Sequence, residues 1–114
     1  MKTLLAVLAL STVCMAADSA AITGYISDSK CALSGAKAKT AAEWIKPAAF
    51  ETCVKDCVKD GSEAVFVTED NKILKFSPAS RSKIAAHLGH KVSVKGTRDG
   101  QTLTVESITD LKMP

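Results

Sequence analysis

The sequence predicts a small, mainly β domain with two helices, and three observations support this fold class. Several short runs in the second half alternate apolar and polar residues, which is the period of a half-buried strand. Two other runs have helical spacing and end in glycine. The chain has 114 residues, a length typical of one domain.

The first residues are typical of a secretory signal peptide. Lys2 precedes an apolar run over residues 4–13, and small residues follow. The run is shorter than the roughly 20 residues that cross a bilayer as a helix. We expect residues 1–16 to be the signal, with cleavage as late as residue 20, and residues 17–114 to form a single exported domain, periplasmic or secreted. The alternative is a buried N-terminal helix.

Composition limits the class of partner. Without Lys2 the formal net charge falls from +3 to +2, which is too near neutral to indicate a polyanionic partner. The chain has one Trp, one Tyr and three Phe, too few to predict the stacking platforms of a nucleic-acid site. No second long apolar segment follows the signal, so no transmembrane segment is expected in the mature chain.

The mature chain begins with a predicted strand and an irregular segment. Residues 21–27 alternate, with Ile22 and Ile26 on one face. Residues 28–40 have no strong period and many small side chains, so we expect a loop there. From Ala41 the pattern becomes helical.

The strongest helical pattern follows Pro47, a residue type tolerated in the first turn of a helix. Apolar residues recur at i, i+3, i+4, i+7 and i+8, as in an amphipathic helix: Phe50, Cys53, Val54, Cys57 and Val58. Gly61 supplies a left-handed stop. Both cysteines of this helix are therefore expected to point toward the core.

The second half predicts two hairpins around a short helix. Residues 64–76 read as a hairpin around Asp70-Asn71. Residues 78–88 are expected to form the helix. Residues 91–108 read as a second hairpin around Asp99-Gly100.

The predicted order is therefore strand, helix, strand, strand, helix, strand, strand. Five strands with a helix between the third and fourth have the order of an OB-fold, a five-stranded Greek-key barrel. The cysteine-bearing helix is then an insertion between strands one and two. The alternative is an α+β two-layer sandwich, with both helices on one face of an antiparallel sheet.

Short motifs carry a resemblance to known proteins. The stretch GYISDSKC, the C-x3-C helix, GHKVSVKGT and TLTVESI together resemble a group of small exported bacterial proteins of uncharacterised function. The second half is also similar to periplasmic bacterial OB-fold proteins in its V-x-V-x-G stretch and terminal V-x-x-I. The resemblance implies the fold and export, and no catalytic signature accompanies it.

Three cysteines remain once the signal, with Cys14, is removed: Cys31, Cys53 and Cys57. In an oxidising compartment we expect a disulfide from Cys31 to one of the other two, which leaves one thiol over. Closing such a loop stabilises a fold by roughly 3 kcal/mol. The cysteines could instead pack as small apolar residues of the core.

The other alternative is a metal site. Thiolates four residues apart on one helix can share an ion, and Cys31 could supply a third ligand to zinc or copper. A fourth ligand could come from one of three further residues: Asp28, His87 or His90. For the two histidines we favour a simpler role, as partly exposed residues at the end of a helix.

No enzymatic activity is expected. Thiol oxidoreductases place a cysteine of C-x-x-C at a helix N-terminus, whereas these cysteines are spaced C-x3-C in the last half of their helix. One predicted class is a non-enzymatic binding or structural module of the cell envelope, with Tyr25, Asp28 and Trp44 as candidate contacts to a peptide, saccharide or envelope component. The other is a metal-binding or redox-sensing protein that uses the three cysteines.

Overall fold

The computed structural model describes residues 21–113, so the predicted signal peptide lies outside the described residues. The described chain is mainly β, as predicted, with three α-helices. The strands are β1 (Ile22–Asp28), β2 (Ala64–Thr68), β3 (Ile73–Phe76), β4 (Lys91–Asp99) and β5 (Thr102–Leu111). The helices are α1 (Ser29–Ser34), α2 (Pro47–Lys59) and α3 (Arg81–Ile84), with 3-10 turns η1 (Ala41–Glu43), η2 (Pro78–Ser80) and η3 (Ala85–His87).

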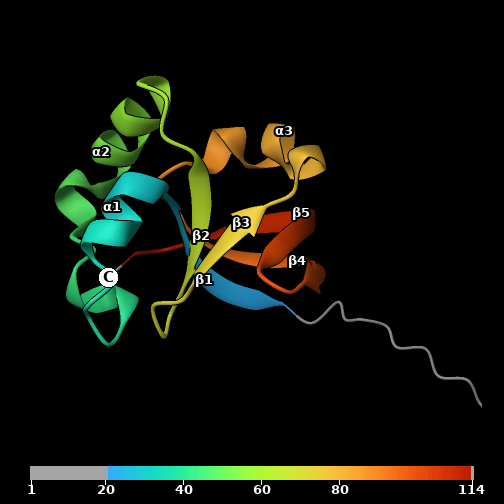
Figure 1. Cartoon of the computed structure of the whole chain (residues 1–114), viewed down its shortest axis with the longest axis horizontal. Helices are drawn as coiled ribbons and strands as arrows, with labels where there is room; N and C mark the ends of the chain where they lie inside the picture. Colours follow the sequence, from blue (N-terminus) through green and yellow to red (C-terminus); the bar gives the residue numbers. More distant parts are fainter. Residues whose placement is uncertain (1–20, 114) are drawn as a thin grey trace, which may run out of the picture.

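The five strands pair in a closed ring. Their order is β1-β2-β3-β5-β4, and β4 pairs again with β1 (Figure 1). All neighbours are antiparallel except β3 and β5, which run parallel. This mixed, closed sheet differs from the open antiparallel sheet of the two-layer alternative. No helix within residues 21–113 is long and apolar enough to cross a membrane.

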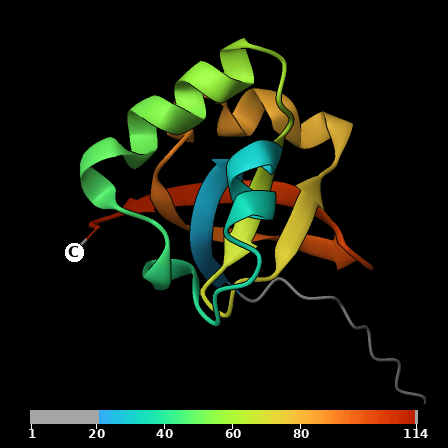
Figure 2. The same ribbon diagram turned by 60° about the vertical axis from the view of Figure 1, so that its left-hand side comes forward.

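Alternation along the strands produces two hydrophobic cores. Ile26 and Phe66 point into the ring, where they pack with a first cluster: Leu74, Phe76, Ile84, Val92, Val94, Leu103 and Val105. Their neighbours Tyr25, Val65 and Val67 point outward and pack with a second cluster: Ala32, Ala41, Ile45, Phe50 and Val54. The second cluster lies under the insertion between β1 and β2, whose helices α1 and α2 cover one side of the ring (Figure 2).

A short helix replaces the expected loop at residues 28–40. Asp28 caps α1 by accepting a hydrogen bond from the backbone N–H of Cys31, at 3.1 Å, and the N–H of Gly35 closes its other end. The buried side chain of Ala32 anchors α1 against the second core. Six residues are too few to show an apolar stripe, which is why the sequence period did not reveal this third helix.

Other boundaries differ slightly from the prediction. The helical pattern that begins at Ala41 gives only the turn η1, and α2 starts separately at Pro47. The left-handed stop is confirmed, because Gly61 has φ of +110°. The loop of the last hairpin is Gly100-Gln101, one residue later than predicted. The helix expected at residues 78–88 consists of the consecutive short pieces η2, α3 and η3.

Asn71 fastens the insertion to the β2–β3 turn. The indole Nε1–H of Trp44 donates to its Oδ1 at 2.8 Å. Its Nδ2 donates to the carbonyls of Gly35 and Ala38, at 2.9 and 2.8 Å. Asn71 has φ of +64°, a conformation that asparagine tolerates better than most residues. One turn residue thus connects three points of a segment that precedes it by more than 25 residues.

Candidate functional site

Three thiols converge where α1 lies beside α2. Cys31 comes from α1, and Cys53 and Cys57 lie one turn apart on α2. The Sγ atoms of Cys31 and Cys53 are 3.5 Å apart, and the three Sγ atoms lie within 4.8 Å of one another. The structure therefore brings together the three cysteines that the sequence grouped.

The prediction that both cysteines of α2 face the core is wrong for Cys53, which is exposed, whereas Cys57 is half-buried. The buried side of α2 is set by Phe50 and Val54. At about 100° per residue, Cys57 lies about 40° from the middle of that side and Cys53 about 80° from it. The two cysteines therefore flank the buried stripe on one side and turn toward α1.

The thiols are not bonded to one another. The shortest separation, 3.5 Å between Cys31 and Cys53, exceeds the roughly 2.05 Å of a disulfide bond. All three cysteines are free in this structure.

A buried carboxylate adjoins the thiols. Asp28 ends β1, and its side chain is fully buried. Oδ2 accepts the capping bond from the N–H of Cys31. Oδ1 has no hydrogen-bond partner among residues 21–113. A buried carboxylate oxygen without a partner is costly, because its desolvation is not compensated.

The surroundings of Cys31 and Cys57 favour the protonated thiols. Burial raises the pKa of Cys31, and hydrogen bonds with Asp28 and Cys53 raise it further. Burial also raises the pKa of Cys57, as do the nearby Asp28 and Cys53. Catalytic thiols usually have lowered pKa values, whereas the pKa values of Cys31 and Cys57 are raised. A bound cation would reverse the effect, because a coordinating thiol is deprotonated.

An apolar groove of about 510 Å³ opens beside Cys31 and Cys53. Trp44 and Phe50 form part of its lining, with ring centroids 6.1 Å apart in an edge-to-face arrangement. Trp44 therefore borders this groove. Tyr25 is only 4% exposed and packs edge-on against Phe50, with ring centroids 6.2 Å apart, so its ring lies beneath this surface.

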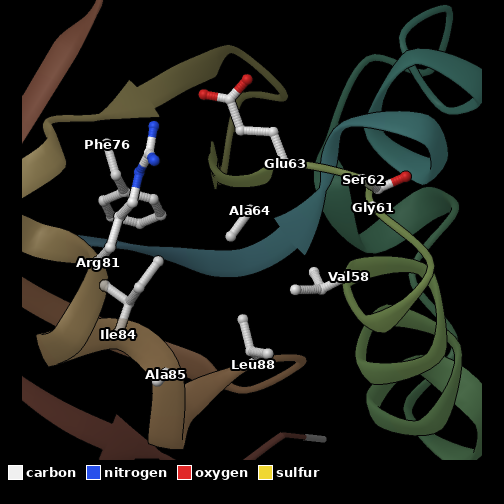
Figure 3. Close-up of a pocket in the computed structure, with 10 residues that line it drawn as sticks. All are labelled: Val58, Gly61, Ser62, Glu63, Ala64, Phe76, Arg81, Ile84, Ala85 and Leu88. Carbon is white, nitrogen blue, oxygen red and sulfur yellow. The ribbon is translucent and has the colours of Figure 1, made fainter.

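A second cavity of about 450 Å³ lies between the C-terminal end of α2 and α3. Val58, Ile84 and Leu88 supply apolar side chains to it, while Glu63 and Arg81 bring opposite charges from its two sides (Figure 3). Among residues 21–113, no cysteine, histidine or unpartnered buried polar group lines this cavity, so its described lining indicates no particular ligand.

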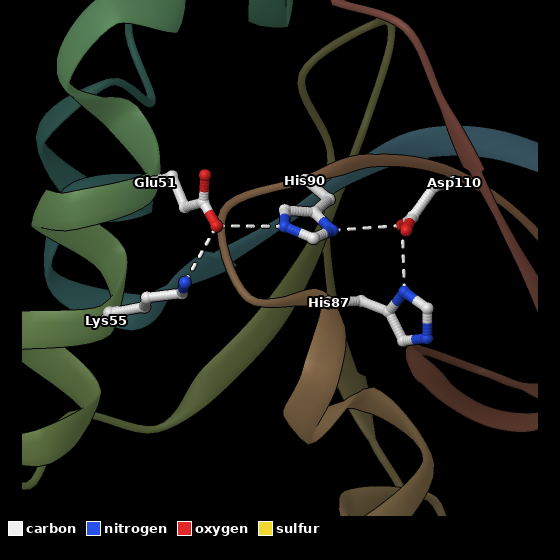
Figure 4. A network of polar contacts seen from close by, with 5 residues as sticks. All are labelled: Glu51, Lys55, His87, His90 and Asp110. Carbon is white, nitrogen blue, oxygen red and sulfur yellow. Dashed lines mark hydrogen bonds and ion pairs between the residues drawn. The ribbon is translucent and has the colours of Figure 1, made fainter.

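The histidines belong to a different cluster from the cysteines, so neither completes the thiol group. His87 Nδ1 and His90 Nδ1 lie 2.8 and 3.0 Å from the same oxygen, Oδ1 of Asp110 (Figure 4). His90 Nε2 lies 3.0 Å from Oε2 of Glu51. The sequence placed the histidines at a helix end but carried no signal for these carboxylates, which lie 20 residues or more away along the chain.

We compared the chain with protein-family models, with curated proteins and with solved structures, and none of the three comparisons finds a match. The function is therefore argued from the residues and their geometry, because a fold by itself does not determine function.

Proposed function

We propose that this protein is an exported, non-enzymatic OB-fold module in which Cys31, Cys53 and Cys57 hold a soft metal ion, Cu(I) or Zn²⁺. The ring order β1-β2-β3-β5-β4, with α3 between β3 and β4, supports the OB-fold assignment. The signal-like residues 1–16 support export.

The convergence of the three sulfur atoms carries the proposal. Thiolates bind zinc at about 2.3 Å, so sulfurs that share one ion lie about 3.8 Å apart in a tetrahedral site and about 4.0 Å apart in a trigonal one. The three Sγ atoms lie within 4.8 Å of one another, with the closest pair at 3.5 Å. Side-chain shifts of no more than about 1 Å would bring the three sulfurs to the spacing of such a site.

The choice of ion depends on the fourth ligand. Three thiolates alone suit Cu(I), which prefers soft ligands. Tetrahedral Zn²⁺ needs a fourth ligand. The Asp28 carboxylate, with its unpartnered Oδ1, adjoins Cys31 but lies outside the group of three sulfurs, so it would have to move closer to bind the same ion. An ion would also supply the positive charge that this buried oxygen lacks.

Native mass spectrometry, thiol counting and metal analysis on protein isolated through the export pathway test this function. We expect one ion per chain and three protected thiols, which become free when a chelator removes the ion. Cys53→Ser should weaken binding at least about tenfold, since it removes a ligand. Thr52→Ala, at the exposed neighbouring position of α2, is the matched control and should bind normally. Absence of metal with three free thiols would contradict the proposal.

The second candidate is a binding module with a Cys31–Cys53 disulfide, favoured by the 3.5 Å approach of their sulfurs. The bridge would link residues 22 positions apart and stabilise the fold by about 3 kcal/mol in the chain-entropy model. Trp44 and the groove would then face a peptide, saccharide or envelope component. This alternative predicts a mass two daltons below the reduced chain and one free thiol, and Cys31→Ser should then lower Tm only under oxidising conditions.

A further inference from the structure

The histidine cluster has the composition of a metal site. Nδ1 of His87 and Nδ1 of His90 both contact Oδ1 of Asp110. One ligand atom from each of the three residues lies within 4.8 Å of the other two. Imidazole and carboxylate together suit borderline divalent ions such as Zn²⁺, Ni²⁺ and Cu²⁺. Such ions bind nitrogen and oxygen at about 2.0 to 2.2 Å, which places adjacent ligands about 3.0 to 3.5 Å apart. The present separations from Asp110, 2.8 and 3.0 Å, are close to that spacing.

The backbone aims the three side chains at one point. His87 ends η3 and His90 directly precedes β4, with Gly89 between them at φ of +78°. A side chain at Gly89 would also overlap the backbone of Glu51, so both its conformation and its lack of a Cβ are required. Asp110 lies near the end of β5, in register with Val92 of β4, and so faces the corner that carries the histidines.

A carboxylate behind His90 supplies a second, independent observation. Metal-bound histidines usually donate their other ring N–H to a carboxylate, which fixes the tautomer and the ring orientation. Nε2 of His90 lies 3.0 Å from Oε2 of Glu51, and the same oxygen lies 2.7 Å from Nζ of Lys55 (Figure 4). Lys55 pairs with Glu51 at i, i+4 and so helps to fix the position of its carboxylate. This arrangement orients Nδ1 of His90 toward Asp110 and His87.

With an ion between the three side chains, a neutral His90 would have a suitable partner at each of its two ring nitrogens. A carboxylate only accepts hydrogen bonds, so the ion-free arrangement requires a proton on both nitrogens of His90. With an ion bound, Nε2–H still donates to Glu51 while the lone pair of Nδ1 faces the metal. The side chains of His87 and His90 are 23% and 27% exposed, and that of Asp110 is 51% exposed, so an ion and its water ligands can enter from solvent.

We propose that His87, His90 and Asp110 form a binding site for a divalent ion of the zinc, nickel and copper(II) class, oriented by Glu51 and separate from the thiol site. The site joins the corner before β4 to the end of β5 and, through Glu51, to α2. A cavity of about 310 Å³, lined in part by His90, Glu51 and Asp110, opens beside it.

Long-range ¹H–¹⁵N NMR of the two imidazole rings during a Zn²⁺ titration of the reduced full chain tests the site directly. We expect the Nδ1 resonances of both histidines to shift on binding, with Nε2 of His90 keeping its proton. Asp110→Asn should weaken this binding at least about tenfold, since it removes a ligand. Asp99→Asn, an exposed carboxylate at the far end of the same hairpin, is the matched control and should leave the binding unchanged.

The readout is independent of the thiol site. If the cysteines bind the first equivalent of Zn²⁺, the imidazole shifts appear with the second; if they do not, the shifts appear with the first. Should Asp110→Asn fail to fold, judged by far-ultraviolet circular dichroism, His87→Gln takes its place with the same expectation. Imidazole resonances that stay unchanged at millimolar Zn²⁺, or that shift equally in wild type and Asp110→Asn, would overturn the proposal and leave a hydrogen-bonded cluster held by an imidazolium ion.

Discussion

Replacing Asn71 by glycine should weaken the attachment of the insertion, residues 29–63, to the β2–β3 turn. The substitution removes three hydrogen bonds, one donated by Trp44 and two accepted by the carbonyls of Gly35 and Ala38. At about 1 kcal/mol net for each bond, the loss is about 3 kcal/mol. Glycine adopts φ of +64° with less strain than asparagine, which offsets up to about 1 kcal/mol of this loss. We expect the free energy of unfolding to fall by about 2 to 3 kcal/mol.

Urea denaturation followed by far-ultraviolet circular dichroism measures this change, and the fluorescence of the single tryptophan, Trp44, reports the broken indole bond. Gly100→Asn is the control, because Gly100 has φ of +63° and open space around it. This substitution measures only the preference for glycine over asparagine at positive φ. Its effect on the free energy of unfolding has the opposite sign, because asparagine replaces glycine. If Asn71→Gly stabilises the protein by as much as Gly100→Asn destabilises it, the three hydrogen bonds add nothing to the free energy of unfolding. That result would refute the reasoning.

Two further predictions concern packing and pH. Val54→Ala, at a fully buried position of α2, should lower the free energy of unfolding by about 2 kcal/mol, and Val58→Ala, at a half-buried one, by clearly less; equal losses in urea denaturation would contradict the described orientation of α2. The hydroxyl of Thr68, with a smaller contribution from Lys72, lowers the pKa of Asp70, so the stability that this carboxylate adds is present above pH 3.8 and is lost as pH falls through its lower folded pKa. Asp70→Asn should therefore unfold at lower urea concentration than wild type at neutral pH and at the same concentration in strong acid, and a difference that persists in acid would rule out the carboxylate as its source.

The strands could be predicted from the sequence because their information is local. Period-two alternation indicated β1, β4 and β5, whereas β-branched and aromatic residues on either side of a turn indicated β2 and β3. Pro47 and Gly61 marked the ends of α2. The second core could not be predicted in this way. Tyr25, Val65 and Val67 alternate with Ile26 and Phe66 in the ring, yet both sets are buried, because the insertion covers the outer face of β1 and β2. Which face is covered depends on contacts between segments far apart in the chain.

The candidate sites also combine local features, which the sequence reveals, with long-range placement, which it does not. The three cysteines could be grouped from their residue type, but their orientation depended on α1, whose cap and buried alanine leave no periodic signal. The histidine cluster depends entirely on long-range placement, since Asp110 and Glu51 reach it from β5 and α2. Two of its members, Asp110 and Glu51, resemble ordinary exposed carboxylates in the sequence.

Helix α2 connects these features, because three of its sides have different partners. Phe50 and Val54 pack on the outer face of β1 and β2. At about 100° per residue, Cys53 and Cys57 lie on one flank of that stripe, toward α1, whereas Glu51 lies on the other flank, toward His90. An ion at either proposed site would therefore hold α2 against a different part of the protein, so each should stabilise the fold by RT ln(1 + [L]/Kd). If both sites exist and α2 docks as one rigid helix, Cys53→Ser should remove the thermal stabilisation by the thiol-bound ion and leave the stabilisation through the histidine site intact.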